Sequence, residues 1–233
     1  MSVGAMSVFA TISDQDQQPR RAQATAGQLV WCVLEIAACV AMLILLAPLL
    51  ILIAIAIRLD SPGPVFFRQE RLGRDRKPFE LNKFRTMRHG VGEERHREFV
   101  LGLIAGEIPE QREQGPRFKL AHDERVTHVG RVLRRTSLDE LPQLWNVLRG
   151  DMSLVGPRPP IGYEVEHYPE HWLRRFDVKP GITGLWQVSG RSELTLEDMV
   201  ALDIRYIEER SLCGNVAILL RTVPAVLSTR GAS

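Results

Sequence analysis

The sequence predicts an α+β fold that is mostly helical, in which a membrane segment precedes a small domain with a short β-hairpin. Three observations predict it. Residues 29–57 are almost uninterruptedly apolar, residues 65–85 alternate in character on either side of a turn, and residues 216–227 repeat apolar side chains at helical spacing. The chain has 233 residues, of which 45% are hydrophobic and 25% charged, and this fits one domain with an appendage.

The composition excludes several classes of protein. The formal net charge is only +2, so the local distribution of charge matters more than the total. The three cysteines, Cys32, Cys39 and Cys213, form no CxxC pattern, so neither a disulfide framework nor a structural zinc site is expected. Basic residues are not interleaved with aromatic ones, so no nucleic-acid partner is expected.

The apolar segment is the longest feature of the chain. Its only charged residue is Glu35, and it exceeds the ~20 residues that a membrane-spanning helix needs. The first twenty residues are polar and the apolar run is too long for a signal peptide. We therefore expect a flexible polar tail over residues 1–28 and a membrane segment over residues 29–58.

Pro48 lies near the middle of this segment, where it removes a helical hydrogen bond and bends the chain. The segment can then be a kinked spanning helix or a re-entrant hairpin that leaves on the side it entered. Basic residues favour the cytoplasmic side, and both flanks are basic, with Arg20 and Arg21 before the segment and Arg58 after it. The residues alone leave these two topologies open.

The elements that follow are assigned from turns and periodicity. Strands are expected at 65–70 and 79–85 around a turn at 73–77, and Trp145 is expected to pack in a helix core. The helices are expected over 93–104, from near Ser137, over 196–210 with Thr195 as N-cap, and over 216–227, with a loop over 106–125. The last helix either faces the core or lies in the membrane interface.

An acidic pair, Asp139 and Glu140, lies in a basic, proline-punctuated stretch. One interpretation is structural: Ser137 and Glu140 have the spacing of a capping box at a helix start. The other is catalytic, because free N–H groups in a first helical turn keep a carboxylate ionised and attract phosphate.

Several cations accompany the pair. Arg158 is held between Pro157 and Pro159, and Arg134 lies just upstream of the acids, while Lys83 and Arg85 lie at the end of the expected hairpin. These are either ordinary ion pairs or a phosphate site, since a guanidinium suits bidentate phosphate binding. Rigid glycine and proline turns around them favour phosphoryl transfer with Mg²⁺ bridging the charges.

Five ordered blocks carry a family resemblance. They are residues 59–71, 83–87, 136–143, 152–159 and 179–191. Together they closely resemble the bacterial sugar transferases, the small monotopic phosphoglycosyl transferases, over about residues 29–232. The carboxy-terminal part looks most like the hexose-1-phosphate transferases of exopolysaccharide and O-antigen pathways. Those enzymes often carry further helices and a domain in front, and this chain looks like a core-only form.

The resemblance implies a two-step reaction that needs Mg²⁺. Asp139 would attack the sugar-linked phosphorus of a UDP-sugar, release UMP and form a phosphosugar-aspartyl intermediate, which undecaprenyl phosphate then accepts. Glu140 would be the partner carboxylate, and both acids would contact the metal. Arg134 and Arg158 match phosphate-contacting arginines, and Lys83 and Arg85 fall in a motif near the site. The role of Glu140 as cap, metal ligand or base stays open.

The resemblance also implies a re-entrant helix-break-helix at the cytoplasmic face of the bacterial inner membrane, followed by a cytoplasmic catalytic domain over 59–233 with interfacial helices. A homodimer is also consistent with the family. The family's Ser-Pro break reads Ala47-Pro48 here, and its acid after a basic pair becomes Glu35 without the pair. The alternative is a non-catalytic membrane scaffold of the same fold. A general phosphodiesterase would need further metal ligands.

Overall fold

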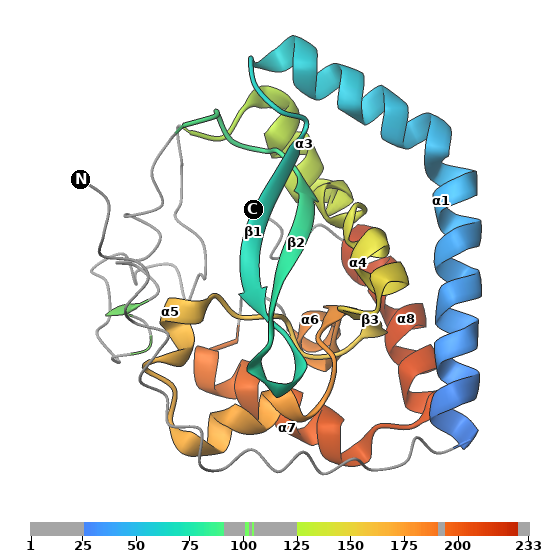
Figure 1. The fold of residues 1–233 in the computed structure, drawn as a ribbon, viewed down its shortest axis with the longest axis vertical. Helices are drawn as coiled ribbons and strands as arrows, with labels where there is room; N and C mark the ends of the chain where they lie inside the picture. Colours follow the sequence, from blue (N-terminus) through green and yellow to red (C-terminus); the bar gives the residue numbers. More distant parts are fainter. Residues whose placement is uncertain (1–25, 91–100, 103, 105–124, 191–193, 228–233) are drawn as a thin grey trace.

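The computed structural model describes residues 26–90, 101–102, 104, 125–190 and 194–227. Residues 1–25 of the tail expected over 1–28, most of the helix at 93–104 and nearly all of the loop at 106–125 lie outside the described residues. Residues 26–28 of that tail are helical. The described part of the chain is mostly helical, as the sequence predicted, and contains two small sheets. Figure 1 shows one long helix curving along one side of these elements.

That helix, α1, covers Ala26–Asp60 and contains Pro48. An 18-residue window within residues 29–60 has a mean hydropathy of 3.2, and the helix is long and apolar enough to cross a membrane. At 1.5 Å per residue its 35 residues span about 50 Å, more than the ~30 Å of a hydrocarbon core. The helix bends in Figure 1, and helical structure is continuous through the proline, so the expected break is a bend within one helix.

The hairpin confirms the alternating pattern. Strands β1 (Phe66–Leu72) and β2 (Pro78–Phe84) pair antiparallel, and Phe67 lies opposite Lys83. The 3₁₀ turn η2 (Arg74–Arg76) joins the two strands. The pairing places Lys83 near the end of β2, where the hairpin meets the helical part of the molecule.

A second sheet was not predicted from the sequence. Strands β3 (Ser153–Val155) and β4 (Gly181–Thr183) pair in parallel. The two backbones approach so closely that a Cβ on Gly181 would lie 2.0 Å from the backbone nitrogen of Gly156. Glycine is therefore required for this contact.

The remaining elements are helical. They are α3 (His128–Thr136), η4 (Leu138–Glu140), α4 (Gln143–Arg149), α5 (Gly162–Val165), η5 (Glu170–Asp177), α6 (Leu185–Ser189), α7 (Leu196–Glu209) and α8 (Leu212–Leu227). Thr195 caps α7 in a capping box with Asp198, as expected for its N-cap position. Helix α8 contains Pro224 and begins four residues earlier than the periodic pattern indicated.

Two hydrophobic clusters join these elements to α1. One contains Cys39 of α1, Leu81 of β2 and Leu144 of α4. The other contains Ile53 and Ile57 of α1, with Leu138 and Leu141 on either side of the acidic pair packed against it. The turn that carries the acids is therefore fixed on the second half of α1.

Two expectations are wrong. Ser137 does not begin an α-helix: it is the left-handed C-cap of α3, with φ of 56°, and it precedes only the 3₁₀ turn η4, to which its side chain makes no cap hydrogen bond. The predicted capping box with Glu140 is therefore absent, and the next α-helix starts at Gln143. Trp145 is not in a helix core, because 56% of it is exposed.

Candidate active site

The acidic pair lies on η4, the 3₁₀ turn between α3 and α4. Backbone hydrogen bonds close the turn, from Glu140 to the Ser137 carbonyl at 3.2 Å and from Leu141 to the Leu138 carbonyl at 3.3 Å. Because the two leucines pack against α1, the acids between them occupy the polar side of the turn. The local fold thus presents Asp139 and Glu140 together without using either as a helix cap.

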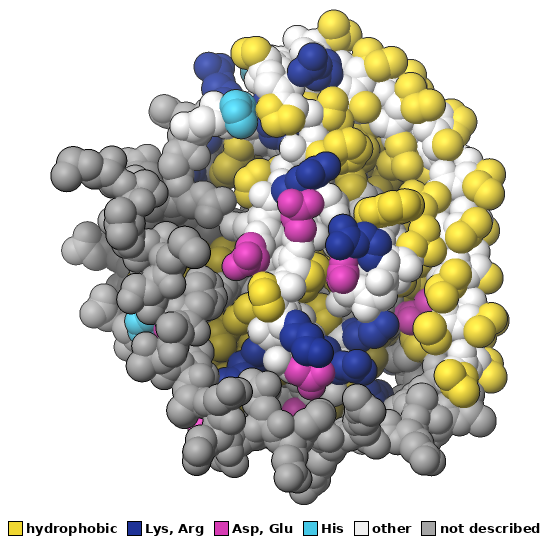
Figure 2. All heavy atoms as spheres, in the orientation of Figure 1, with side chains coloured by type: hydrophobic (Ala, Val, Ile, Leu, Met, Phe, Trp, Pro, Cys, Tyr) yellow, Lys and Arg dark blue, Asp and Glu magenta, His cyan; other side chains and the backbone are white. Residues whose placement is uncertain are grey.

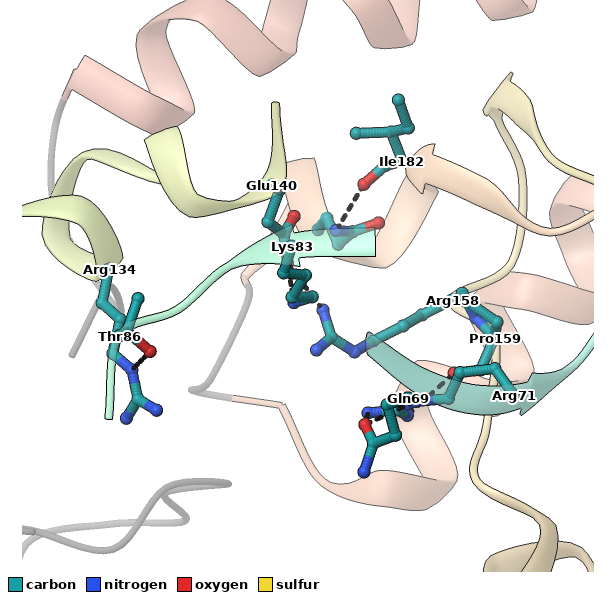
Figure 3. A network of polar contacts seen from close by, with 10 residues as sticks. Gln69, Arg71, Lys83, Thr86, Arg134, Glu140, Arg158, Pro159 and Ile182 are labelled. Carbon is teal, nitrogen blue, oxygen red and sulfur yellow. Dashed lines mark hydrogen bonds and ion pairs between the residues drawn. The ribbon is translucent and has the colours of Figure 1, made fainter. Parts of the chain in front are cut away.

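Two cations from distant parts of the chain converge on Glu140. The Lys83 ammonium donates to Oε1 at 2.7 Å, and the Arg158 guanidinium approaches the same oxygen at 3.4 Å. Figure 3 shows Lys83 coming from β2 and Arg158 from the loop after β3. Asp139 is close enough to contribute to the electrostatic environment of Lys83. The structure therefore brings four of the predicted site residues together.

The environment of Lys83 perturbs its acidity. Burial lowers the pKa of the Lys83 ammonium below its ordinary value. Glu140 opposes this shift, Arg158 adds to it, and Asp139 opposes it. The net lowering follows because desolvation outweighs the attraction of the two acids. A desolvated cation beside two carboxylates is the kind of perturbed group that marks functional sites.

Arg158 is held by its backbone. Arg71 of β1 donates to the Pro159 carbonyl at 3.0 Å, and Arg175 of η5 donates to the Arg158 carbonyl at 3.1 Å. Arg175 in turn forms a buried ion pair with Asp203 of α7 at 2.8 Å. The guanidinium of Arg158 therefore projects from a segment that is braced from two sides.

Sequence reasoning missed these supporting residues. Arg71 is inside the block at 59–71, but nothing in the sequence says that it contacts Pro159. Arg175 and Asp203 are in separate elements, so only the folded chain pairs them. The one available signal was the position of Asp203, which falls at helical spacing from the apolar residues Met199 and Val200 of α7. An acid on the apolar face of a helix needs a buried partner.

The other two predicted cations are used elsewhere. Arg134 of α3 donates from Nε to the Thr86 hydroxyl at 2.9 Å, and Figure 3 places it apart from the Lys83–Glu140 contact. Arg85 is almost fully buried and donates to the carbonyls of Ser61 at 2.7 Å and Ile57 at 3.4 Å. The Arg85 guanidinium thus satisfies backbone carbonyls at the carboxy-terminal end of α1.

The donor set fits a Mg²⁺ ion bound jointly with a substrate. Within the described ranges there is no group of three or more His, Cys, Asp or Glu side chains placed to hold a metal. Mg²⁺ is commonly bound by one or two carboxylates together with substrate phosphates and water. Asp139 and Glu140 supply that number of carboxylates, and the rest of the coordination would come from the ligand.

The fold and the site together define a class of protein. A helix long and apolar enough to cross a membrane carries a turn with two carboxylates, and cations suited to phosphate binding surround that turn. The sequence profile of the bacterial sugar transferases matches residues 27–229. The chain therefore belongs to the bacterial sugar transferase family.

Individual relatives cover most of this chain. It is 44% identical over 211 residues to the UDP-glucose:undecaprenyl-phosphate glucose-1-phosphate transferase of Caulobacter vibrioides. The alignment covers 86% of this chain and 70% of that protein. It is 41% identical to the exopolysaccharide production protein ExoY of Rhizobium meliloti, over 81% of each chain. It is 44% identical to the UDP-galactose-lipid carrier transferase of Erwinia amylovora, but spans only 38% of that protein.

Proposed function

We propose that this protein transfers a sugar-1-phosphate from a UDP-sugar to undecaprenyl phosphate, releasing UMP and forming undecaprenyl-diphospho-sugar in exopolysaccharide or O-antigen synthesis. The observation that carries the proposal is the convergence of Lys83 and Arg158 on the Asp139–Glu140 turn, which itself packs on the membrane-type helix. The names of the relatives from Caulobacter vibrioides and Erwinia amylovora support the substrate class.

The proposed chemistry has two displacements at one phosphorus atom. First, a carboxylate oxygen of Asp139 bonds to the sugar-linked phosphorus, the phosphoanhydride bond breaks, and UMP leaves with the electron pair. Second, a phosphate oxygen of undecaprenyl phosphate bonds to that phosphorus, and the acyl-phosphate bond breaks to regenerate the Asp139 carboxylate. No oxidant or external proton donor is required by this balance.

The neighbouring residues would serve both displacements. Lys83 and Arg158 stabilise negative charge on the phosphoryl oxygens, because fixed cations in a partly desolvated site cost little reorganisation. When no substrate is bound, the contacts of Lys83 and Arg158 with Glu140 hold that carboxylate beside Asp139. Mg²⁺ bound by Asp139 and Glu140 would neutralise phosphate charge.

The membrane placement is part of the proposal. We infer that residues 29–58 re-enter the inner membrane from its cytoplasmic face and that residues 59–233 form the cytoplasmic catalytic domain. The bend of α1 in Figure 1, the proline inside it and the basic flanks support this topology. A lipid phosphate at the membrane surface would then reach the acidic turn on α1.

Replacing Asp139 with asparagine tests the nucleophile. Asp139→Asn keeps the shape of the side chain but removes the ionised oxygen, so UMP release from UDP-glucose or UDP-galactose should fall to background. The measurement is UMP formation by purified protein with and without undecaprenyl phosphate. Asp177→Asn, a change at an exposed acid on η5, should leave the rate unchanged.

Two results would count against the proposal. Robust UMP formation by the Asp139→Asn protein would remove Asp139 as the nucleophile. A folded wild-type protein that forms no UMP from any UDP-sugar in a broad panel would instead favour the scaffold alternative. An adduct with the mass of a phosphosugar on Asp139, trapped when the acceptor is withheld, would support the covalent step.

A further inference from the structure

Glu35 is the one acidic residue in the apolar stretch of α1, and it points into the protein. It is 7% exposed, whereas its neighbours Leu34 and Ile36 are 51% and 44% exposed. Its Oε1 oxygen accepts a hydrogen bond from the Leu154 backbone N–H at 2.7 Å and another from the Ser153 hydroxyl. A buried carboxylate is tolerated when it is hydrogen-bonded in this way.

The two donors belong to β3, which lies beside the N-terminal half of α1 (Figure 1). The far side of β3 is fixed to β4, because Ser153 donates to the Pro180 carbonyl at 2.8 Å and Gly156 to the Thr183 carbonyl at 2.9 Å. Glu35 therefore holds this short strand on the side that faces α1.

The strand leads directly into the site. Leu154 is followed by Val155, Gly156, Pro157 and then Arg158. The proline leaves this connection little backbone freedom. A displacement of β3 would therefore shift the backbone that carries the Arg158 guanidinium, which approaches Glu140 at 3.4 Å.

We propose that Glu35 is a positioning residue: it ties the membrane helix to β3 and thereby fixes where Arg158 stands relative to the acidic turn. The inference deepens the proposed function and rests on it for the role of Arg158. Asp139 and Glu140 reach α1 through Leu138 and Leu141, near Ile53 and Ile57. The same helix thus holds both halves of the site, at its two ends.

Hydrogen exchange tests the tie without using activity. In protein reconstituted in lipid nanodiscs, Glu35→Ala should accelerate amide exchange in peptides covering residues 153–158, because the Leu154 N–H loses its acceptor. Glu35→Gln should retain most of the protection, since its amide oxygen can accept the same bonds. Ile44→Ala, at a 72% exposed position of the same helix, is the matched control and should change nothing there.

Kinetics test the route through Arg158. Glu35→Ala should lower kcat/KM for UMP release by about 10- to 100-fold, the effect of a small misplacement of a charged group. Ser153→Ala should lower it less, because the Leu154 N–H still donates. In an Arg158→Ala background the Glu35→Ala change should cost almost nothing further, because both act on one interaction.

Unchanged exchange over residues 153–158 in Glu35→Ala would overturn the tie. Fully additive kinetic losses of Glu35→Ala and Arg158→Ala would overturn its action through Arg158. If Glu35→Ala fails to fold, Ser153→Ala, which removes one of the two donors to Glu35, carries the same comparisons at smaller amplitude. A wild-type protein without UMP release would sink the proposed function, while the exchange experiment would still decide whether Glu35 holds β3.

Discussion

At the scale of single residues, Glu140 shows how one side chain organises the site. Its Oε1 oxygen meets Lys83 from the hairpin and Arg158 from the loop after β3. In the folded protein it is not the capping residue that its spacing from Ser137 suggested. Of the three roles that the sequence left open, the cap is excluded, and metal ligand and base stay predictions.

The acidity of Lys83 leads to a pH prediction. Since burial lowers its pKa below the ordinary 10.5, the ammonium is charged below that lowered value and neutral above it. UMP release should therefore decline on the alkaline side at a lower pH than an ordinary lysine would give. In Lys83→Arg the guanidinium stays charged throughout, so a weaker activity should persist to higher pH. The measurement is the pH profile of kcat/KM, and identical alkaline limbs would exclude Lys83 as the titrating group.

Arg175 illustrates a residue whose loss should be costly although it touches no substrate. Arg175→Met leaves the buried Asp203 carboxylate without its 2.8 Å partner, which typically costs about 3–5 kcal/mol. The neighbouring Arg174 pairs with Glu208 at the surface, so Arg174→Met should change the free energy of unfolding by at most about 1 kcal/mol. Chemical denaturation in detergent measures the free energy of unfolding of both variants. Equal losses would mean that the buried Arg175–Asp203 pair contributes no more to stability than the surface pair.

At the scale of elements, the parallel pair of β3 and β4 is the most demanding contact. Gly181→Ala would place a Cβ 2.0 Å from the Gly156 nitrogen, and backbone on both sides leaves no room to shift. We expect a loss of free energy of unfolding of about 3 kcal/mol, at the upper end of the usual range for overpacking, because main chain must be displaced. Gly162→Ala is the matched control, since a Cβ there meets nothing within 4 Å. Thermal unfolding of both variants is the measurement, and equal midpoints would contradict the required close approach.

The elements also show which signals in the sequence were informative. The hairpin and α7 were predictable because local patterns specify them: alternation about a turn in one case, and Thr195 as N-cap in the other. The sheet of β3 and β4 was missed because each strand has three residues and its partner is far along the chain. The prediction of a helix N-cap at Ser137 was wrong because serine can occupy both an N-cap and a left-handed C-cap, and here it ends α3.

The candidate site was predictable in part for the same reason. Asp139, Glu140, Lys83 and Arg158 were identified through sequence blocks, and the structure brings them together. What holds them could not be predicted, because Arg71, Arg175 and Glu35 act through contacts between distant segments. Local patterns identify reactive groups, whereas long-range packing chooses their supports.

At the scale of the whole molecule, two helices present apolar surface. Figure 2 shows hydrophobic side chains covering the visible side of α1. Helix α8 has a side that faces the core, where Ile218 is buried, and an apolar side that is exposed, where Leu220 and Val223 lie. The core-facing interpretation is therefore confirmed, and the membrane-interface one stays a prediction. A face of this kind beside an apolar helix is consistent with contact to lipid, and the homodimer suggested by the family stays a prediction.

The topology of the chain gives the last prediction. If α1 re-enters the membrane, tags at residue 1 and residue 233 should both lie on the cytoplasmic face, because the bend returns the chain to the side where it began. Protease accessibility in intact spheroplasts and in inverted vesicles measures this, with a periplasmic reporter as the control for sidedness. Pro48→Ala removes the proline inside α1, so a straighter helix should expose a fraction of the residue-1 tag to the periplasm. Tags on opposite faces in the wild-type protein would show that α1 spans the membrane.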